Sequence, residues 1–227
     1  GATNSSGLTH NWGSFHSSNT NVREINWGNA TVNFNDTGTS IGLNVVTNLT
    51  QTSGNSNINV YATGSSVAYG GGTSQPWYNF SVIGEDTNAA YTLQGALRVT
   101  NSLTLLGNGT NRLRFKYNTL GQRINVTIAN ATFRADNVDF EDIHILNDGV
   151  TVDLSSNSSG NCGGNENITF TPAQTQTYNS ADIDYFSNST LWTSRCPLPQ
   201  DDVIISQGGV IFNKPILGRN ITITGSP

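Results

Sequence analysis

The stretch INVTIANATFRADNVDFEDIHI, residues 124–145, carries the pattern that decides the fold. Its apolar residues alternate with polar ones in three short runs, followed by the start of a fourth: Ile124, Val126 and Ile128; Phe133 and Ala135; Val138 and Phe140; Ile143 and Ile145. The fourth run begins nineteen residues after the first. Three short strands and a repeat close to twenty residues are typical of one coil of a β-solenoid.

The same stretch also contains two acceptor sites for N-linked glycans, at Asn125 and Asn130. Asn125 has the opposite parity to Ile124 and Val126, so its side chain is expected to point outward. Asn130 shares the parity of the buried residues and cannot continue that strand if it carries a sugar. The sequence therefore predicts a corner of the coil at residues 129–130.

Similar alternating runs recur along the whole chain, whereas no segment keeps a helical apolar stripe for three turns. Runs near Ile58, Phe80, Val99 and Ile124 follow one another at intervals of roughly twenty residues. The sequence predicts an all-β fold and favours a parallel β-helix, or β-solenoid, with irregular coils. A β-sandwich or jelly roll, or a pilin-like sandwich completed by a neighbour's strand, remains an open alternative, because short strands with Gly and Asn turns build these too.

Composition excludes several classes of function. Charged residues make up only 11% of the 227 residues, against about 25% in typical soluble domains. A net charge of -5 with ten Lys and Arg argues against binding to nucleic acid or to an anionic membrane, since both need clustered cations. No apolar run approaches the ~18 residues of a membrane-spanning helix, so we expect no membrane insertion. No zinc-ligand spacing or calcium loop is present, and the sequence predicts neither a metal site nor a cofactor.

Glycosylation motifs and cysteines predict the compartment. Twelve Asn residues stand in N-x-S/T with no Pro between, nine of them with Thr: Asn4, Asn29, Asn35, Asn48, Asn79, Asn108, Asn125, Asn130, Asn157, Asn167, Asn188 and Asn220. Cys162 and Cys196 fit one disulfide in an oxidising compartment, with two buried free thiols as the alternative. The chain starts at Gly1 and lacks Met, which indicates a processed form or an excised piece. We therefore expect a secreted or cell-surface protein carrying covalent N-glycans.

The C-terminal sequence LWTSRCPLPQDDVIISQGGVIFNKPILGRNITITG, residues 191–225, has a different texture. A Trp precedes a Pro-containing turn, a pair of Asp residues, an alternating strand and a Gly-Gly turn. This pattern resembles the opening of G8-type and related segments, which begin β-helix stretches in extracellular surface proteins, although Cys196 stands before the prolines. The resemblance implies a parallel β-helix on a cell surface and no catalytic residue.

Two regions are therefore expected in the chain. A main β-rich glycosylated domain covers residues 1–187 and a C-terminal β segment covers residues 188–227, tied back by the disulfide. The segment is interpreted as the start of a further β-helix stretch or as a strand-exchange tail.

Two groups of charged residues are candidates for chemistry. Asp139 and Glu141 alternate with apolar residues, so both carboxylates are expected to face outward about 7 Å apart. This separation suits acid and base catalysis on a glycosidic bond, whereas a solvated acidic face is the simpler interpretation. Arg112, Arg114 and Lys116 form a basic stripe that is interpreted as a site for an acidic glycan, as the wet side of a strand, or as a charge ladder with the acidic pair.

Together these features predict a structural protein without enzymatic activity: a subunit or segment of an extracellular filament, appendage, surface layer or adhesin stalk. Its partners would be copies of itself or other surface glycoproteins, joined through strand edges. The candidate interface residues are the basic stripe and the apolar residues of two C-terminal strands: Arg112, Arg114, Lys116, Val203, Ile205, Ile221 and Ile223. The alternative is a β-helix that binds or cleaves carbohydrate, with Asp139 and Glu141 as the acid pair and exposed Trp side chains stacking on sugar rings.

Overall fold

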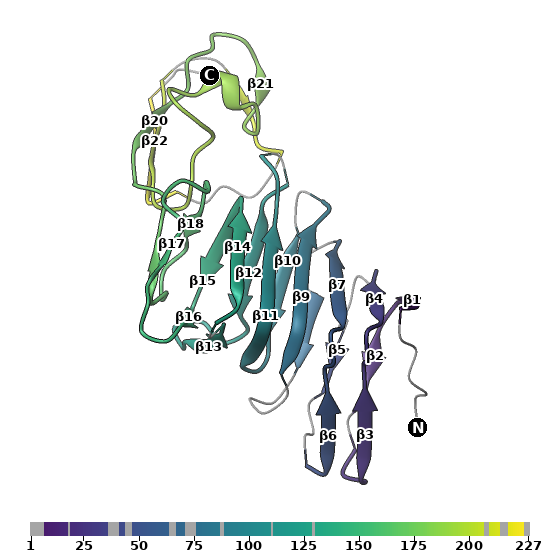
Figure 1. The fold of residues 1–227 in the computed structure, drawn as a ribbon. Helices are drawn as coiled ribbons and strands as arrows, with labels where there is room; N and C mark the ends of the chain where they lie inside the picture. The colour runs from purple at the N-terminus through teal and green to yellow at the C-terminus, as the bar shows by residue number, and fades with distance from the viewer. Residues whose placement is uncertain are drawn as a thin grey trace.

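The alternating runs fold as short strands, and each strand pairs in parallel with the strands one coil before and after it. In this computed structural model the chain is a β-solenoid of about seven turns. Every pairing between the named strands is parallel. The predicted parallel β-helix is thus confirmed, and the sandwich alternatives are wrong because they require antiparallel hairpins. Figure 1 shows the coils stacked side by side from β1 at the N-terminal end.

The structure describes residues 7–17, 19–35, 41–43, 47–63, 67–70, 76–86, 89–109, 111–128, 130–206, 209–213 and 218–224. Among them, none forms a helix long and apolar enough to cross a membrane. The helical content of these residues is one 3-10 turn, η1 (Ser189–Leu191).

Two large parallel sheets form most of the solenoid wall. The first has eight strands: β1 (Thr9–Trp12), β4 (Thr31–Phe34), β7 (Asn57–Ala62), β9 (Trp77–Gly84), β11 (Leu97–Leu106), β13 (Ile124–Thr127), β14 (Thr132–Asp136) and β16 (Ile143–Leu146). The second has seven: β2 (Phe15–His16), β5 (Ile41–Gly42), β8 (Val67–Gly70), β10 (Ala90–Leu93), β12 (Leu113–Tyr117), β15 (Val138–Glu141) and β18 (Gly160–Asn161).

Four smaller sheets complete the fold. Two lie beside the large sheets and contain β3 (Arg23–Asn26) with β6 (Leu49–Thr52), and β17 (Val152–Asp153) with β19 (Ile168–Thr169). The other two are C-terminal and contain β20 (Thr175–Thr177), β22 (Asp202–Ile205) and β24 (Asn220–Ile223), and β21 (Asp184–Tyr185) with β23 (Val210–Ile211).

The stretch of residues 124–145 forms one coil, as the sequence predicts. Ile124 in β13 pairs with Ile143 in β16, which confirms the nineteen-residue repeat. The predicted corner is also present, because β13 ends at Thr127, β14 begins at Thr132, and Asn130 has a left-handed backbone with φ of 60°. Asn tolerates this conformation better than most residues. Residue 129 lies outside the described residues.

Coil length varies, although the strands stay in register. On the outer face, Asn59 donates to Asn33 and Asn33 donates to Asn11, across 26 and 22 residues. A second asparagine ladder joins Asn101 and Asn79 to Asn57, with steps of 22 residues. The extra residues of the longer coils lie between the strands. The number of residues from one coil to the next therefore varies, and the sequence shows no repeat of fixed length.

The interior is filled by side chains that stack from coil to coil. Phe80, Tyr91, Phe115, Phe140 and Phe170 form one aromatic column, with successive ring centroids 6.0 or 6.1 Å apart. Four of these five rings belong to a hydrophobic core of buried residues that extends from Trp27 to Leu154, and the half-buried Phe170 packs against it. Coils inside the stack are therefore covered by apolar contacts on both sides, as expected for a solenoid.

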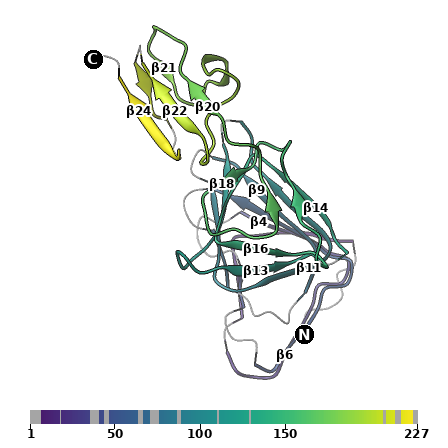
Figure 2. The same cartoon turned by 90° about the vertical axis from the view of Figure 1, so that its left-hand side faces the viewer.

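A second, smaller core lies at the C-terminal end. Its buried members are Tyr178, Phe186, Trp192, Val203 and Ile205. We call residues 7–171 the solenoid body and residues 172–224 the C-terminal unit. Figure 2 shows β20, β22 and β24 of this unit projecting beyond the stacked coils. Tyr178 and Phe186 of the second core precede residue 188, the predicted domain boundary. The division of the chain into domains at that residue stays a prediction.

Candidate functional site

The basic stripe and the acidic pair predicted from the sequence lie on neighbouring strands. Arg114 and Lys116 lie in β12, Arg112 directly precedes it, and the acidic pair lies in β15. Arg114 pairs in register with Asp139, as Lys116 does with Glu141. Side chains of equal parity on adjacent parallel strands share one face, so the opposite charges meet. Of the three interpretations of the basic stripe, the charge ladder with the acidic pair is the one that the structure contains.

The ladder consists of two ion pairs. In each pair the arginine lies two residues before the residue that is in register with its acidic partner. Arg112 holds Asp139 through two nitrogens, with Nε 3.0 and 3.1 Å from the two carboxylate oxygens and Nη2 2.5 Å from Oδ1. Nη2 of Arg112 also donates to the Ser158 carbonyl at 2.7 Å. Nη2 of Arg114 lies 2.5 Å from Oε2 of Glu141. Two-nitrogen guanidinium contacts of this kind fix the carboxylate in position.

The acidic pair is buried rather than solvated, which corrects the expectation of two exposed carboxylates. Asp139 is 6% exposed and Glu141 is 9% exposed. The cover over Asp139 is the backbone of the next coil, at β18. A Cβ atom on Gly160 would lie 1.9 Å from Oδ1 of Asp139 and 2.7 Å from Cδ of Pro199, so only glycine fits there. Covered in this way and held by Arg112, Asp139 is not placed to act on water as one member of an acid and base pair.

Two hollows lie beside the ladder: the first is lined by residues of the solenoid body, and the second lies between the body and the C-terminal unit. They have volumes of about 560 and 490 Å³, and both are lined by Glu141, Cys162 and Gly163. The Cys162 thiol is largely buried, and this burial, reinforced by the negative charge of Asp139, raises its pKa from 9.0 to about 12. The thiol is therefore protonated at neutral pH and is a poor nucleophile.

The predicted disulfide between Cys162 and Cys196 is not formed. The two thiols have separate surroundings. Cys162 lines the hollows next to the charge ladder, whereas Cys196 packs against the second core with its Sγ 3.2 Å from the Ser187 carbonyl. The C-terminal unit is held to the body by other contacts.

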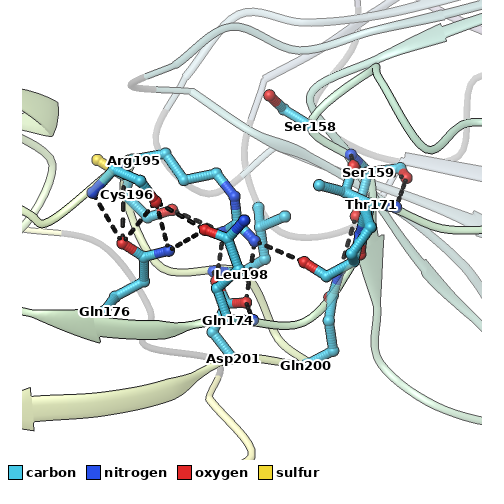
Figure 3. A network of polar contacts seen from close by, with 12 residues as sticks. Ser158, Ser159, Thr171, Gln174, Gln176, Arg195, Cys196, Leu198, Gln200 and Asp201 are labelled. Atoms are coloured by element: carbon cyan, nitrogen blue, oxygen red, sulfur yellow. Dashed lines mark hydrogen bonds and ion pairs between the residues drawn. The ribbon is translucent and has the colours of Figure 1, made fainter.

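A buried ion pair organises the C-terminal unit (Figure 3). Asp201 is fully buried and accepts hydrogen bonds from both terminal nitrogens of Arg195. Its carboxylate also accepts from the backbone nitrogens of Leu198 at 2.7 Å and Gln174 at 2.8 Å. These four donors compensate the cost of burying the charge. The Asp pair at residues 201–202 was visible in the sequence, but nothing in the pattern identified Arg195 as its partner.

Gln200 connects this network to the solenoid body. Its Nε2 donates to the carbonyls of Ser159 at 3.0 Å and Thr171 at 2.7 Å, and its Oε1 accepts from the backbone nitrogen of Asn161 at 2.9 Å. Sequence reasoning missed this residue, since a single Gln carries no pattern. Gln200 anchors the junction in the role that the disulfide was expected to fill.

The predicted interface residues divide into two sets. Val203 and Ile205 are buried in the second core at 1% and 5% exposure, so the prediction that these two lie at an open edge is wrong, because the sequence did not show which strands have neighbours. Arg112 and Arg114 are engaged by the ladder, and their role at an interface stays a prediction. Lys116 is half-buried.

Ile221 and Ile223 are 44% and 62% exposed on β24, the last strand of its sheet. They pair in register with Val203 and Ile205, so they continue a buried column beyond its last covered position.

Most of the acceptor asparagines lie on the surface, and Asn4 lies outside the described residues. Seven are exposed: Asn29, Asn35, Asn48, Asn108, Asn125, Asn130 and Asn220. Four are half-buried: Asn79, Asn157, Asn167 and Asn188. In the part of the chain that the structure describes, no three His, Cys, Asp or Glu side chains gather to hold a metal ion.

Comparisons with known proteins add no family. No family model matches the chain, and searches of the curated proteins and of the solved structures find no match. The resemblance of residues 191–225 to G8-type segments therefore stays a prediction, and function has to be argued from the geometry.

Proposed function

We propose that this protein is a structural β-solenoid of an extracellular assembly, and that it associates with further copies through the open strand β24. The observation that carries the proposal is the exposure of Ile221 and Ile223 in line with the buried residues Val203 and Ile205. In a solenoid, such positions are covered by the next coil. A strand added by a neighbouring copy would cover them in the same way.

The backbone of β24 supports strand addition. The backbone nitrogen of Thr224 donates to the Ile205 carbonyl at 3.0 Å, so this side of the strand faces β22. In a parallel ladder the direction of backbone groups alternates along the strand, which turns those of Ile221 and Ile223 away from β22. An unpaired strand edge with exposed apolar residues is a ready template for another strand.

The size of the second core also supports association. It has five buried members among the described residues, and other large apolar side chains of the C-terminal unit remain exposed. Phe212 stacks on the buried Phe186 with ring centroids 5.7 Å apart, yet it is 47% exposed. Exposed apolar side chains gathered on one part of a surface are typical of interaction sites.

The extracellular location is part of the same proposal and rests on the sequence. Low charge and many acceptor sites for N-glycans are the properties of a surface that is kept soluble by sugar rather than by charge. Structural surface proteins need such a surface, together with an elongated shape, and the stack of coils in Figure 1 provides the shape.

Carbohydrate binding or cleavage is the weaker candidate. The hollows beside Glu141 favour it, but both carboxylates are held by arginines and buried. Trp27, Trp77 and Trp192 are buried as well, and they offer no flat surface to a sugar ring. The assembly proposal is therefore preferred.

The proposal is tested by comparing the wild-type protein with Ile221→Asp and Ile223→Asp in analytical ultracentrifugation and negative-stain electron microscopy. We expect concentration-dependent oligomers or filaments for the wild type and monomers for both variants. Thr222→Asp is the matched control, because Thr222 lies on the same strand with the opposite parity and is also exposed. Wild-type protein that stays monomeric at high concentration would count decisively against the proposal.

A further inference from the structure

The acceptor asparagines differ in what their side-chain amide nitrogens do, and this difference predicts where glycans are carried. An N-glycan is attached to Nδ2, where it replaces one of the two hydrogens and adds a bulky ring. An amide that already donates a hydrogen bond within the fold keeps that bond only if the remaining hydrogen is the donating one and the sugar fits beside it. An amide that faces solvent loses nothing.

Asn157 and Asn167 use their amides to bind the previous coil. Nδ2 of Asn157 donates to the Ala135 carbonyl at 2.9 Å. Nδ2 of Asn167 donates to the Ile145 carbonyl at 3.0 Å and lies 3.0 Å from Nε2 of His144. Both side chains are half-buried, so a sugar on either amide would have to be placed between coils.

Asn79 stands in the middle of an asparagine ladder. Its Nδ2 donates to Oδ1 of Asn57 at 2.9 Å, and its Oδ1 accepts from Nδ2 of Asn101 at 2.6 Å. The amide is thus bonded to the coils on both sides. Asn48 is similarly engaged, because its Nδ2 donates to the Thr20 carbonyl of the previous coil at 2.9 Å.

The two acceptor asparagines in the C-terminal unit donate to carboxylates. Nδ2 of Asn188 lies 3.0 Å from Oδ2 of Asp184, and Nδ2 of Asn220 lies 2.8 Å from Oδ1 of Asp202. Hydrogen bonds to ionised acceptors are stronger than those between neutral groups. Asn220 belongs to β24, the strand proposed to receive a neighbour.

Four acceptor asparagines are exposed and make no Nδ2 hydrogen bond with any described residue: Asn29, Asn35, Asn125 and Asn130. Asn29 precedes β4, Asn130 precedes β14, and Asn35 directly follows β4, so these three lie at corners of the solenoid. Asn125 faces His144 through Oδ1 at 3.2 Å, which leaves its Nδ2 directed elsewhere. Each of these amides can carry a sugar without breaking a contact of the fold.

We infer that the folded protein carries N-glycans on Asn29, Asn35, Asn125 and Asn130, and that the six engaged acceptors stay unmodified. The engaged set is Asn48, Asn79, Asn157, Asn167, Asn188 and Asn220. The inference rests on the proposed function, because only a secreted or surface chain meets the glycosylation machinery. Its consequence is a sugar coat on the solenoid body and a bare C-terminal unit, with the edge of β24 open to a second copy.

Site-resolved mass spectrometry of glycopeptides tests the inference, with the full chain secreted from a glycosylating host and purified in folded form. We expect the four open acceptors to be mostly occupied and the six engaged acceptors to be mostly unmodified. Equal occupancy of the two sets, or a preference for the engaged set, would overturn the inference and leave the proposed function standing. Secreted protein without any glycan would remove the extracellular part of the proposed function and the inference with it.

Two matched substitutions provide an independent check. Thr132→Ala and Thr169→Ala each remove one exposed acceptor threonine from a strand, for Asn130 and Asn167 respectively, and leave the asparagine in place. The intact mass of secreted Thr132→Ala should fall by one glycan, whereas that of Thr169→Ala should change only by the substitution. Loss of a glycan from both variants would overturn the inference.

Discussion

The solenoid body and the C-terminal unit use the same parallel ladders but differ in how their cores are closed. In the body, the aromatic column from Phe80 to Phe170 is covered from coil to coil, and the core extends from Trp27 to Leu154. In the described residues of the C-terminal unit, Val203 and Ile205 are followed in the sheet by the exposed Ile221 and Ile223. The comparison teaches that a stack of coils is self-sufficient only where each coil has neighbours on both sides.

Polar contacts take over where apolar cover is missing. The C-terminal unit is organised by the buried carboxylate of Asp201 and is joined to the body by Gln200. A buried ion pair makes a weak net contribution compared with a well-packed core, yet removing one partner is costly. The unit is therefore expected to be the less stable region and the more sensitive to single polar substitutions.

The largest expected effect comes from Asp201→Ala, which leaves the Arg195 guanidinium and two backbone amides without their acceptor. We expect a loss of about 3–5 kcal/mol in the stability of the C-terminal unit, with the body remaining folded. Hydrogen exchange measured by mass spectrometry should show faster exchange in residues 174–206 and unchanged exchange in residues 80–145. The neighbouring change Asp202→Ala is the control, since Asp202 pairs with the exposed Arg219 and should matter little. Uniform unfolding of both regions by Asp201→Ala would show that they are not separate in stability.

A smaller effect is expected from Gly160→Ala at the contact between the two regions. The added Cβ would collide with Asp139 and Pro199, so the chain must shift to accommodate it. Overpacking of this kind typically costs about 1–3 kcal/mol, which urea denaturation would measure. Gly13→Ala is the matched control, because a Cβ there meets no atom within 4 Å. If both substitutions cost equally little, the cover over Asp139 is looser than the structure shows.

Within the body, Glu141→Gln should have only a modest effect. The partner Arg114 has a side chain that is 38% exposed, so solvent weakens the ion pair, and we expect a loss of about 1 kcal/mol or less in thermal or urea denaturation. Glu166→Gln, which affects the more exposed pair with Arg123, should cost still less. Glu141→Gln also separates the two candidate functions. Activity on a glycan panel that is present in the wild type and lost in this variant would favour the carbohydrate alternative.

The smallest effect at neutral pH concerns Cys162, which lies in the body beside a hollow that Pro199 and Gln200 of the C-terminal unit also line. With its pKa raised to about 12, the thiol should react with iodoacetamide at pH 8 at least tenfold more slowly, in rough terms, than in the unfolded chain. The unfolded chain loses the thiol proton near pH 9, whereas the folded chain keeps it until about pH 12. The contribution of this group to the free energy of unfolding is therefore complete below pH 9 and is lost as pH rises toward 12.

Labelling of Cys196→Ser isolates the reaction of Cys162. Rapid labelling of the folded variant at pH 8 would show that burial does not protect this thiol. A Cys162–Cys196 disulfide found in native wild-type protein would contradict the structure at the junction.

Much of the fold could be predicted from the sequence, because alternation and spacing report directly on which residues are buried. Residues 124–145 predicted the strands, the repeat and the corner at Asn130, all of which the structure contains. The sequence could not predict the neighbours of each strand with equal success. Val203 and Ile221 have the same local pattern, yet one is buried and the other exposed, since β24 covers Val203 and no strand of the described residues covers Ile221.

The candidate sites were predicted less well, because charge pairing depends on coil register. Asp139 and Arg112 are 27 residues apart, and local alternation does not show which residues of neighbouring coils come into register. The outward parity of Asp139 was correct, but its burial depends on the next coil and on Pro199. Cysteine count alone suggested a disulfide, whereas only the fold reveals that the two thiols have different surroundings.

The asparagine ladders have a consequence for how this chain tolerates change in length. Ladder steps of 22 and 26 residues coexist with a step of nineteen between Ile124 and Ile143, so the strands keep their alignment while the corners absorb the difference. Peptides inserted at a corner should therefore leave the stack intact, whereas insertions within a strand should not. The solenoid body is in this respect a rod of fixed pitch whose corners can be lengthened independently, which is the property needed to display different loops at regular spacing.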